Sequence, residues 1–228
     1  MDLSIVIPAY NEAANLPLLI KRITESVPKG LKYEIIVVND NSTDNTLEVL
    51  KKLEKKYKVL KHIDKKAERG VGTTIALGIR NAKGKFIITM DADLSHNPKY
   101  IHQFLEKIKE CDMVIGSRYT EKGGMENTLL RKIVSRGFTL YARLMGLKVK
   151  DATSGYRIFR SEIFKDYEFK SKGFDIHIEI PMVANIKGYK IKEIPIVYEK
   201  RFKGKSKLKY AREGPRYVLR ALRCRLNI

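Results

Sequence analysis

Short runs of β-branched residues alternate with stretches of helical periodicity along the first half of the chain. The runs are apolar on both faces, which is typical of buried strands in a mostly parallel sheet. Between them, apolar residues recur every three or four positions, which predicts helices that pack one face on that sheet. The predicted strands and helices occupy, in chain order, 3–8, 16–27, 33–38, 47–57, 85–90, 101–108 and 112–116. This alternation indicates an α/β doubly wound sheet flanked by helices, whose ligands bind beyond the carboxyl ends of the strands.

The pattern changes after residue 120, where Gly123 and the glycine after it indicate a loop. The stretch 127–144 has the period of one long helix, and we expect its apolar face to point inward. Two strand-like runs, 156–159 and 192–198, then flank a helix near 176–186. The residues expected to point inward from the long helix are Leu130, Ile133, Val134, Gly137, Tyr141 and Leu144.

The chain has 228 residues and neither repeats nor an obvious linker, so we expect one domain. Within it we distinguish a first half at 1–120, a second half at 121–207 and a basic tail at 208–228. The formal charge is +20, from 46 Lys and Arg against 26 Asp and Glu, and half of this excess lies between residues 200 and 228. Such a cluster suits nucleic acid, anionic lipid or a phosphorylated substrate, or is simply a solvated surface. A nucleic-acid module also needs aromatic residues or a recognition helix beside the basic stripe, so we expect no nucleic-acid partner.

Membrane spans and leader sequences are not expected. The longest uncharged stretches, such as 3–11 and 71–79, fall far short of the roughly 18 apolar residues of a transmembrane helix. The N-terminus enters a strand pattern without a basic leader or cleavage site, which predicts a cytoplasmic protein. Cys111 and Cys224 are far apart and have no metal-ligand spacing, so both are expected to be free thiols.

Two carboxylates, Asp91 and Asp93, directly follow the predicted strand 85–90. Their mutual repulsion requires a cation or hydrogen bonds, and a hard divalent ion such as Mg²⁺ or Mn²⁺ bridging them to a diphosphate provides that compensation. The same residue types also occur in ordinary strand-terminal turns. Asp40 follows the strand 33–38, where it would accept hydrogen bonds from a nucleobase edge, whereas Ser42 to Asp44 are expected to cap the next helix.

The segment Gly70-Val-Gly72-Thr-Thr-Ile75 has two of the three glycines of a dinucleotide-binding loop. Ile75 stands where the third glycine is required, and no clear strand precedes the segment, so a Rossmann dehydrogenase is not favoured. The four histidines have no metal-ligand spacing and are expected to be structural or on the surface.

Six motifs occur in one order along the chain and together carry a family resemblance. They are Ile5-Val-Ile-Pro8-Ala-Tyr10-Asn11-Glu12, Val37-Val-Asn-Asp40-Asn-Ser-Thr-Asp44, Arg69-Gly70-Val-Gly72, Met90-Asp91-Ala-Asp93, Gly116-Ser-Arg118-Tyr119 and Ser154-Gly155-Tyr156. Over about residues 3–207 the chain resembles family 2 glycosyltransferases of the GT-A fold, and within them the polyprenyl-phosphate (dolichol-phosphate) mannose synthases.

The resemblance implies a nucleotide-sugar site, with GDP-mannose as the favoured donor. In that branch a Gln two residues after the second Asp is a further metal ligand; here Ser95 takes its place, through its hydroxyl or a water that it holds. By position, Pro8, Tyr10 and Glu12 would frame the nucleotide, Asp40 would contact the base, and Asp91 and Asp93 would hold Mg²⁺ or Mn²⁺ and the diphosphate.

The resemblance also implies an acceptor site for a polyprenyl or dolichyl phosphate. Arg118, Arg131 and Ser135 would bind the acceptor phosphate, and catalysis would rest on Asp91, Asp93, Arg118 and Arg131. From the residues alone, Arg131 and Ser135 are four apart on the helix face opposite the apolar one, so they can converge. The basic segment Arg201, Lys203, Ser206 and Lys207 would close over the donor diphosphate and stabilise leaving-group charge.

Transfer to a lipid phosphate needs no strong general base, because a phosphate oxygen is already anionic at neutral pH. The expected reaction is therefore a single inverting displacement. The alternative is transfer to a hydroxyl of a sugar, protein or polysaccharide, for example from a UDP-sugar. That reaction needs a carboxylate over the site, for which Asp151, Asp175 and Glu179 are the candidates.

The tail predicts a short helix that starts at Gly214-Pro215, with arginines on one side and apolar residues on the other. Such a helix suits an anionic membrane surface on the inner face of the cell membrane, and it equally suits docking on the catalytic body. A separate membrane protein that delivers the substrate is the further alternative. The two sides are Arg216, Arg220 and Arg223, and Tyr217, Val218, Ala221 and Leu222.

Overall fold

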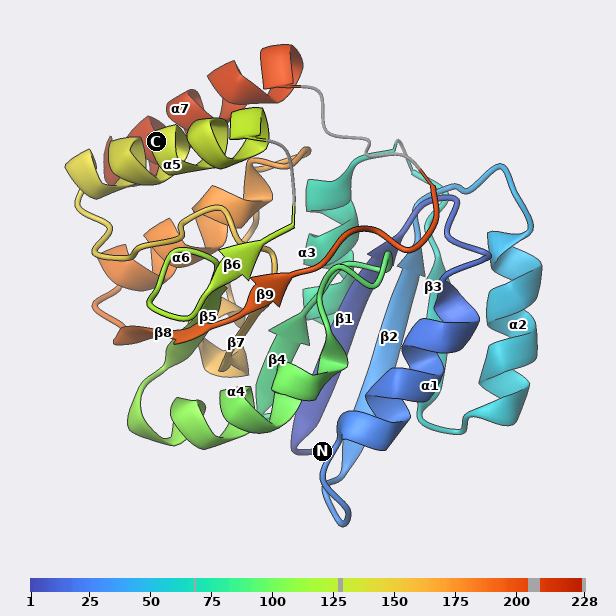
Figure 1. Cartoon of the computed structure of the whole chain (residues 1–228). Helices are drawn as coiled ribbons and strands as arrows, with labels where there is room; N and C mark the ends of the chain where they lie inside the picture. Colours follow the sequence, from blue (N-terminus) through green and yellow to red (C-terminus); the bar gives the residue numbers. More distant parts are fainter. Residues whose placement is uncertain (68, 127–128, 205–209, 227–228) are drawn as a thin grey trace.

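The computed structural model describes residues 1–67, 69–126, 129–204 and 210–226. Its centre is a seven-stranded sheet in the order β3-β2-β1-β4-β7-β5-β8, in which only β7 runs antiparallel to its neighbours (Figure 1). The strands are β1 Leu3–Ala9, β2 Tyr33–Asn39, β3 Leu60–Asp64, β4 Phe86–Thr89, β5 Met113–Ser117, β7 Arg157–Arg160 and β8 Ile191–Pro195, with β6 Gly124–Met125 and β9 Val197–Tyr198 pairing separately. The predicted mostly parallel α/β sheet is confirmed.

Helices cover both faces of the sheet, as the apolar strands require. One core lies between the sheet and α1, α2 and α4, and a second core lies between the opposite face and α3 and α6, with α5 and α7 packed on the outer side of this second core and contributing residues to it. The helices are α1 Leu16–Ser26, α2 Thr46–Lys56, α3 Val71–Asn81, α4 Ile101–Lys107, α5 Leu129–Leu144, α6 Ile176–Ile186 and α7 Tyr210–Leu226; short 3₁₀ turns are η1 Pro98–Tyr100, η2 Ile108–Glu110 and η3 Ser161–Phe164. In the part of the chain that the structure describes, no helix has the length and apolar character that a bilayer crossing requires.

The strand β3 and the helix α3 were absent from the sequence prediction, and both bear on the segment at Gly70. A strand does precede that segment, contrary to our expectation, and Gly72 lies in the first turn of α3. A Cβ at Gly70 would stand 2.3 Å from Lys172 O, and one at Gly72 would stand 2.4 Å from Ser171 O. The glycines therefore allow the start of α3 to pack directly on the backbone of the loop 171–173, which precedes α6.

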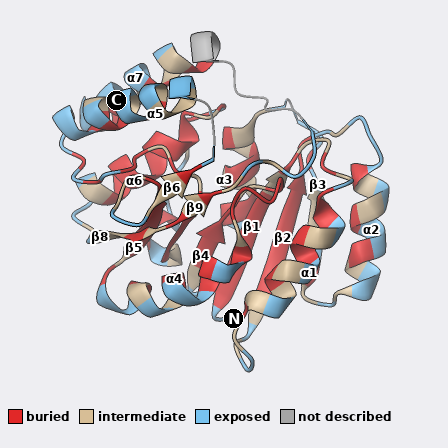
Figure 2. Ribbon diagram, viewed as in Figure 1, coloured by how far each residue is buried: buried red, intermediate tan, exposed pale blue. Residues whose placement is uncertain are grey.

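The inward face predicted for α5 is wrong for Leu130, Ile133 and Leu144, which are 59–73% exposed, and for Gly137, which is exposed too. Val134 and Tyr141 are partly buried, and small or polar residues form the buried positions of the helix. Figure 2 shows exposed positions along the outer sides of α5 and α7, which lie next to each other. The residues of α5 that are buried are Ser135, Thr139 and Ala142.

The tail forms a longer helix than expected, because α7 begins at Tyr210 and contains Pro215 within it. Tyr217 and Ala221 are buried in the second core, and the Tyr217 ring stacks on Phe138 of α5 with centroids 4.8 Å apart. Val218 and Leu222 remain exposed. The helix thus docks on the catalytic body through one strip of its surface and leaves a second apolar strip free of the body.

Both cysteines are buried free thiols, as predicted.

Candidate active site

Acidic side chains gather where β1, β2 and β4 end at one edge of the sheet. A cavity of about 450 Å³, here called the strand-end cavity, lies over this edge. Because the three strands are parallel neighbours, residues far apart in sequence open onto the same space. Among the residues lining it are Pro8, Tyr10, Glu12, Asp40, Asp91 and Asp93.

The turn after β4 has a geometry that fixes Asp93. Leu94 has φ 68°, in the left-handed region that is rare for a branched apolar residue, and its side chain is buried. This turn brings the Ser95 backbone N–H to 3.0 Å from Asp93 Oδ1, and the Ser95 hydroxyl donates to the same oxygen. Ser95 is fully buried and is not among the lining residues of the cavity, so its hydroxyl orients Asp93 from behind.

Arg201, in the segment after β9, already occupies the acidic end of the strand-end cavity. Its guanidinium lies 2.7 Å from Asp93 Oδ2 and 2.8 Å from Glu12 Oε1. Burial alone lowers the pKa of Arg201, but the charges of Asp93 and Glu12 reverse that effect and raise it. Burial also raises the pKa of Glu12, despite a hydrogen bond from Asn15 and the charge of Arg201. The site therefore holds a cation against its carboxylates.

The donor set fits a hard divalent ion that completes its coordination with a ligand. Asp91 and Asp93 supply carboxylate oxygens, and the guanidinium on Asp93 marks a place where positive charge is stabilised. No group of three or more Asp, Glu, His or Cys suited to a metal occurs among the described residues. Mg²⁺ and Mn²⁺ suit such a site, since Mg²⁺ is typically bound through one or two carboxylates and substrate phosphates.

The opposite end of the strand-end cavity is formed by Asp40 and its partners. Lys65 Nζ lies 2.6 Å from Asp40 Oδ1, and the Gly70 N–H donates to Asp40 Oδ2 at 3.0 Å. The Arg69 guanidinium lies over the Tyr10 ring, 4.1 Å from its centroid. Asp40 therefore lines the cavity while its carboxylate already accepts hydrogen bonds from Lys65 and from the Gly70 N–H. Sequence reasoning missed Lys65 and Arg69, although Arg69 stands at the head of a motif used for the resemblance.

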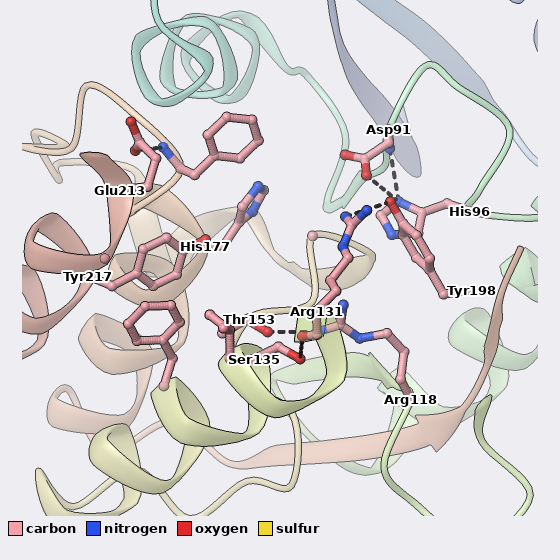
Figure 3. Close-up of a pocket in the computed structure, with 15 residues that line it drawn as sticks. Asp91, His96, Arg118, Arg131, Ser135, Thr153, His177, Tyr198, Glu213 and Tyr217 are labelled. Carbon is pink, nitrogen blue, oxygen red and sulfur yellow. Dashed lines mark hydrogen bonds and ion pairs between the residues drawn. The ribbon is translucent and has the colours of Figure 1, made fainter. Parts of the chain in front are cut away.

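A second cavity, here called the helix-side cavity, lies between α5, α7 and the loop before β7 (Figure 3). Arg118, Arg131 and Ser135 all line it, so the structure brings together the three residues expected to bind an acceptor phosphate. Val134 and Phe138 of α5 form part of its apolar wall, together with Phe174 and Tyr217. The cavity thus has a cationic end and an aromatic end.

Arg118 is tied to a buried carboxylate. Its Nε and Nη2 each lie 2.6 Å from an oxygen of Asp151, and Nη2 also donates to Thr153 Oγ1 at 2.6 Å. Burial opposes the charge, but Asp151 more than compensates and raises the pKa of Arg118. Arg118 is consequently a fixed cation in the wall, whereas Arg131 extends from α5 toward Asp91 and Tyr198, with Nη2 3.2 Å from the Tyr198 hydroxyl (Figure 3).

The two cavities meet at Asp91. This residue, together with Arg131 and Tyr198, lines both. The Asp91 N–H donates to His96 Nδ1 at 2.9 Å, which requires a neutral ring, and burial lowers the pKa of His96 accordingly. The expectation of a structural role for His96 agrees with this contact. Its place beside Asp91 and the place of Tyr198 at the junction were not anticipated, because neither residue belongs to a motif.

The carboxylates considered as general bases do not open onto either cavity. Asp151 is fully buried against Arg118. Glu179 is fully buried too, and accepts hydrogen bonds from the Tyr167 hydroxyl and from two backbone N–H groups. Asp175 is paired with Arg220 at 3.3 Å. Glu213 does line both cavities, but it accepts the Phe174 N–H and pairs with Arg216.

The basic segment after β9 is described as far as residue 204. Lys203 is exposed, and its carbonyl oxygen accepts a hydrogen bond from Asn15 Nδ2 at 3.2 Å. Ser206 and Lys207, expected to complete the segment, lie outside the described residues. Two cations that the sequence analysis did not assign to the nucleotide, Lys172 and Arg216, also line the strand-end cavity.

Comparisons with known proteins show the family and the fold to which the chain belongs. The model of the family described as glycosyl transferase family 2 matches residues 4–168. The chain is 39% identical to a dolichol-phosphate mannosyltransferase of Pyrococcus furiosus over 214 residues, which are 92% of this chain but only 60% of that protein's length. It is 31% identical to an undecaprenyl-phosphate mannosyltransferase of Micrococcus luteus over 211 residues, 89% of this chain and 86% of that protein.

Among solved structures, the fold resembles glucosyl-3-phosphoglycerate synthase from Mycobacterium tuberculosis, crystallised with Mn²⁺, uridine diphosphate and phosphoglyceric acid. The TM-score is 0.73 at 19% identity, and the match covers all of this chain and 79% of that one. The fold is therefore that of the GT-A glycosyltransferases. The chain belongs to glycosyl transferase family 2.

Proposed function

We propose that this protein transfers mannose from GDP-mannose to the phosphate of a polyprenyl or dolichyl phosphate, with inversion at the anomeric carbon. The observation that carries the proposal is the meeting of two unlike cavities at Asp91, one lined by carboxylates and the other by Arg131 and an apolar wall. Two mannosyltransferases named for polyprenyl-phosphate acceptors, 39% and 31% identical to this chain, support the same acceptor class and sugar.

The nucleotide sugar would lie in the strand-end cavity. Pro8, Tyr10 and Glu12, which line the cavity at the end of β1, would face the nucleotide, and Asp40, paired with Lys65, would face the base. Asp91 and Asp93 would hold the divalent ion, which supplies positive charge to the departing diphosphate. Arg201 and Lys203 would add donors to the same leaving group.

The acceptor phosphate would lie in the helix-side cavity beside Arg131 and Ser135, with Arg118 as a fixed charge in the wall. An arginine fork suits a phosphate because it presents paired N–H donors. The first prenyl units would contact Val134 and Phe138, which line the same cavity. A phosphate oxygen is the nucleophile, so the reaction needs no carboxylate to remove a proton. The enclosed positions of Asp151 and Glu179 favour this acceptor over a hydroxyl.

The outer sides of α5 and α7 would rest on the membrane that holds the acceptor. Exposed large apolar residues occur along both helices, and residues of both helices line the helix-side cavity. Basic residues on the same helices, including Arg143 and Arg223, would add about 1 kcal/mol each near anionic lipid. The protein would then lie on the surface of the membrane, and its position on the cytoplasmic face of that membrane stays a prediction. The exposed apolar residues are Leu129, Leu130, Ile133, Leu140 and Leu144 of α5, and Val218, Leu219, Leu222 and Leu226 of α7.

A donor and acceptor panel tests the proposal. The full chain with Mn²⁺ is incubated with GDP- and UDP-sugars and either a short polyprenyl phosphate or a soluble sugar acceptor, and the products are identified by mass spectrometry. We expect a β-linked mannosyl phosphate lipid from GDP-mannose. Glycosylated soluble acceptor, with no product on the lipid phosphate, would instead establish the hydroxyl-transfer alternative.

A further inference from the structure

The segment 199–203, here called the strap, runs from the end of β9 to the acidic residues at the sheet edge, and its Arg201 lines the strand-end cavity. Among the described residues, the strap is the segment that brings a cation, Arg201, onto Asp93. Its backbone is held by four hydrogen bonds: Glu199 N–H to Ser95 O at 3.1 Å, Lys200 N–H to Glu126 Oε2 at 3.4 Å, Phe202 N–H to Asp93 O at 3.1 Å, and Asn15 Nδ2 to Lys203 O at 3.2 Å. The strap is therefore held against the site through its backbone.

Both carboxylate oxygens of Asp93 have donors in this arrangement. Oδ1 accepts from the backbone and hydroxyl of Ser95, and Oδ2 accepts from Arg201 at 2.7 Å. The second arm of the guanidinium reaches Glu12 at 2.8 Å, so a single cation bridges two carboxylates. Arg201 therefore occupies a position on the Asp93 oxygen that a metal ion would also need.

The charge balance explains why the guanidinium stays there. Glu12, Asp91 and Asp93 all line the strand-end cavity, and their mutual repulsion is offset by Arg201. A divalent ion alone would have to displace this cation while gaining few protein ligands, since the described residues hold no three-ligand cluster. A diphosphate makes up for the few protein ligands, because its oxygens bind the metal, and it helps to displace Arg201, because it offers the guanidinium a new anionic partner.

We propose that Arg201 is the counter-ion of the donor site before substrate binds, pairing with Glu12 and Asp93 and withholding Asp93 from the metal until a nucleoside diphosphate draws the guanidinium away. Metal and donor then bind cooperatively, and by linkage each raises the affinity for the other by the same factor. The inference rests on the proposed function, because it takes a nucleoside diphosphate sugar as the donor. Arg201 acts here as a positioning residue before it contacts the leaving group.

Direct measurement of Mn²⁺ binding tests the proposal. Free Mn²⁺ is followed by electron paramagnetic resonance in titrations of the full chain and of Arg201→Met, each with and without GDP. We expect Arg201→Met to bind Mn²⁺ without GDP about tenfold more tightly than the unmodified chain, as a lost charge-assisted hydrogen bond implies. GDP should then enhance Mn²⁺ binding of the variant by a smaller factor than that of the unmodified chain.

Two further variants distinguish the ability of Arg201 to bridge Glu12 and Asp93 from the effect of its positive charge alone. Lys200→Met removes a positive charge from an exposed neighbour on the same segment, and it should behave as the unmodified chain. Arg201→Lys keeps the charge but cannot span both carboxylates, so its Mn²⁺ affinity without GDP should lie between the other two. Equal tightening by Lys200→Met would show a general charge effect and overturn the assignment to Arg201.

The strap itself can carry a reporter, because the chain has no tryptophan and Phe202 is 56% exposed. In Phe202→Trp, Mn²⁺ alone at modest concentration should leave the tryptophan fluorescence emission unchanged, because Arg201 stays on Asp93. GDP with Mn²⁺ should shift that emission, because Arg201 leaves Asp93 and the strap moves. Equal Mn²⁺ affinity and equal GDP enhancement in Arg201→Met and the unmodified chain would overturn this inference and leave the proposed function standing. Absence of Mn²⁺ binding from every variant, with GDP present, would overturn both.

Discussion

The strand-end cavity and the helix-side cavity share Asp91 but are built in opposite ways. The first opens at the ends of buried strands, and its walls carry carboxylates such as Asp40 and Asp93, which are less than a tenth exposed. The second opens beside α5, whose Arg131 and Ser135 face the cavity while leucines cover its outer side. Under the proposed function, two anionic phosphates would be accommodated differently, one through a bridging cation and the other through arginine directly.

The supporting structure of the two cavities differs as well. The strands beneath the strand-end cavity belong to a core that is almost completely buried. Along α5 only Ser135, Thr139 and Ala142 are buried, and Phe138 and Tyr141 pack against the second core while still partly exposed. Regions with little buried apolar surface open more easily, and we expect the acceptor side to be the more mobile of the two.

The largest expected effect is on the carboxylate side. Asp93→Asn removes the charge that would hold the metal and that pairs with Arg201 of the strap, and turnover of GDP-mannose should fall by about a thousandfold. Asp64→Asn serves as control, because Asp64 ends β3 at the same sheet edge but lines neither cavity. Excess chelator should abolish activity of the unmodified chain. Near-normal turnover of Asp93→Asn would contradict the metal assignment.

On the acceptor side the buried pair Arg118–Asp151 should dominate stability. Arg118→Ala leaves Asp151 buried without a counter-charge, which should cost about 3–5 kcal/mol in the free energy of unfolding by urea. The double variant Arg118→Leu with Asp151→Leu should recover most of that loss. Arg160→Ala is the matched control, because its pair with Asp112 is about 30% exposed and should contribute less than about 1 kcal/mol.

Arg131→Ala should separate the two substrates. With a short, water-soluble polyprenyl phosphate, kcat/KM for the acceptor should fall about a hundredfold, since a paired donor to phosphate is lost. GDP affinity should change less, even though Arg131 lines both cavities. Arg143→Ala, on the same helix but exposed, is the control. An equal loss of GDP affinity would place Arg131 on the donor instead.

The exposed apolar side of α5 should decide membrane binding. Leu130→Asp with Ile133→Asp should reduce flotation with anionic vesicles by about tenfold or more, without lowering the free energy of unfolding, because both side chains are already in solvent. The control, Lys51→Asp with Lys52→Asp on exposed positions of α2, changes the net charge more but leaves α5 intact. Stronger loss in the control would mean that charge alone drives the binding.

The smallest effect is a pH dependence of stability from His177 in the wall of the helix-side cavity. Burial lowers the pKa of His177 well below its ordinary value, so below pH about 6.5 the unfolded chain binds a proton that the folded chain does not. This group should therefore reduce stability by up to about 1.4 kcal/mol per pH unit as the pH falls through that range. In His177→Gln the free energy of unfolding should fall less steeply with decreasing pH below about 6.5. Above pH about 7.5 this group should add no pH dependence to the stability of either protein.

The apolar runs predicted β1, β2, β4 and β5 because their β-branched residues are buried on both faces. The strand β3 was missed because Leu60–Asp64 is largely polar, and α3 was missed because it contains glycines and threonines that favour helix weakly. Its Gly78 is required by packing, since a Cβ there would stand 2.3 Å from Val6 Cγ1. Such close approaches depend on the whole fold and leave no periodic signal.

The sequence by itself determined that Asp91 and Asp93 follow a buried strand and that Arg131 and Ser135 share a helix face, because both facts depend on local periodicity. The tertiary structure decided what surrounds them: Arg201 on Asp93, Asp151 on Arg118, and α5 with its leucines outward. An apolar helix face can lie on a protein core or on lipid, and both environments remove it from water. The pattern is the same in either case, so only the packing of α5 on the body determines which face is inside.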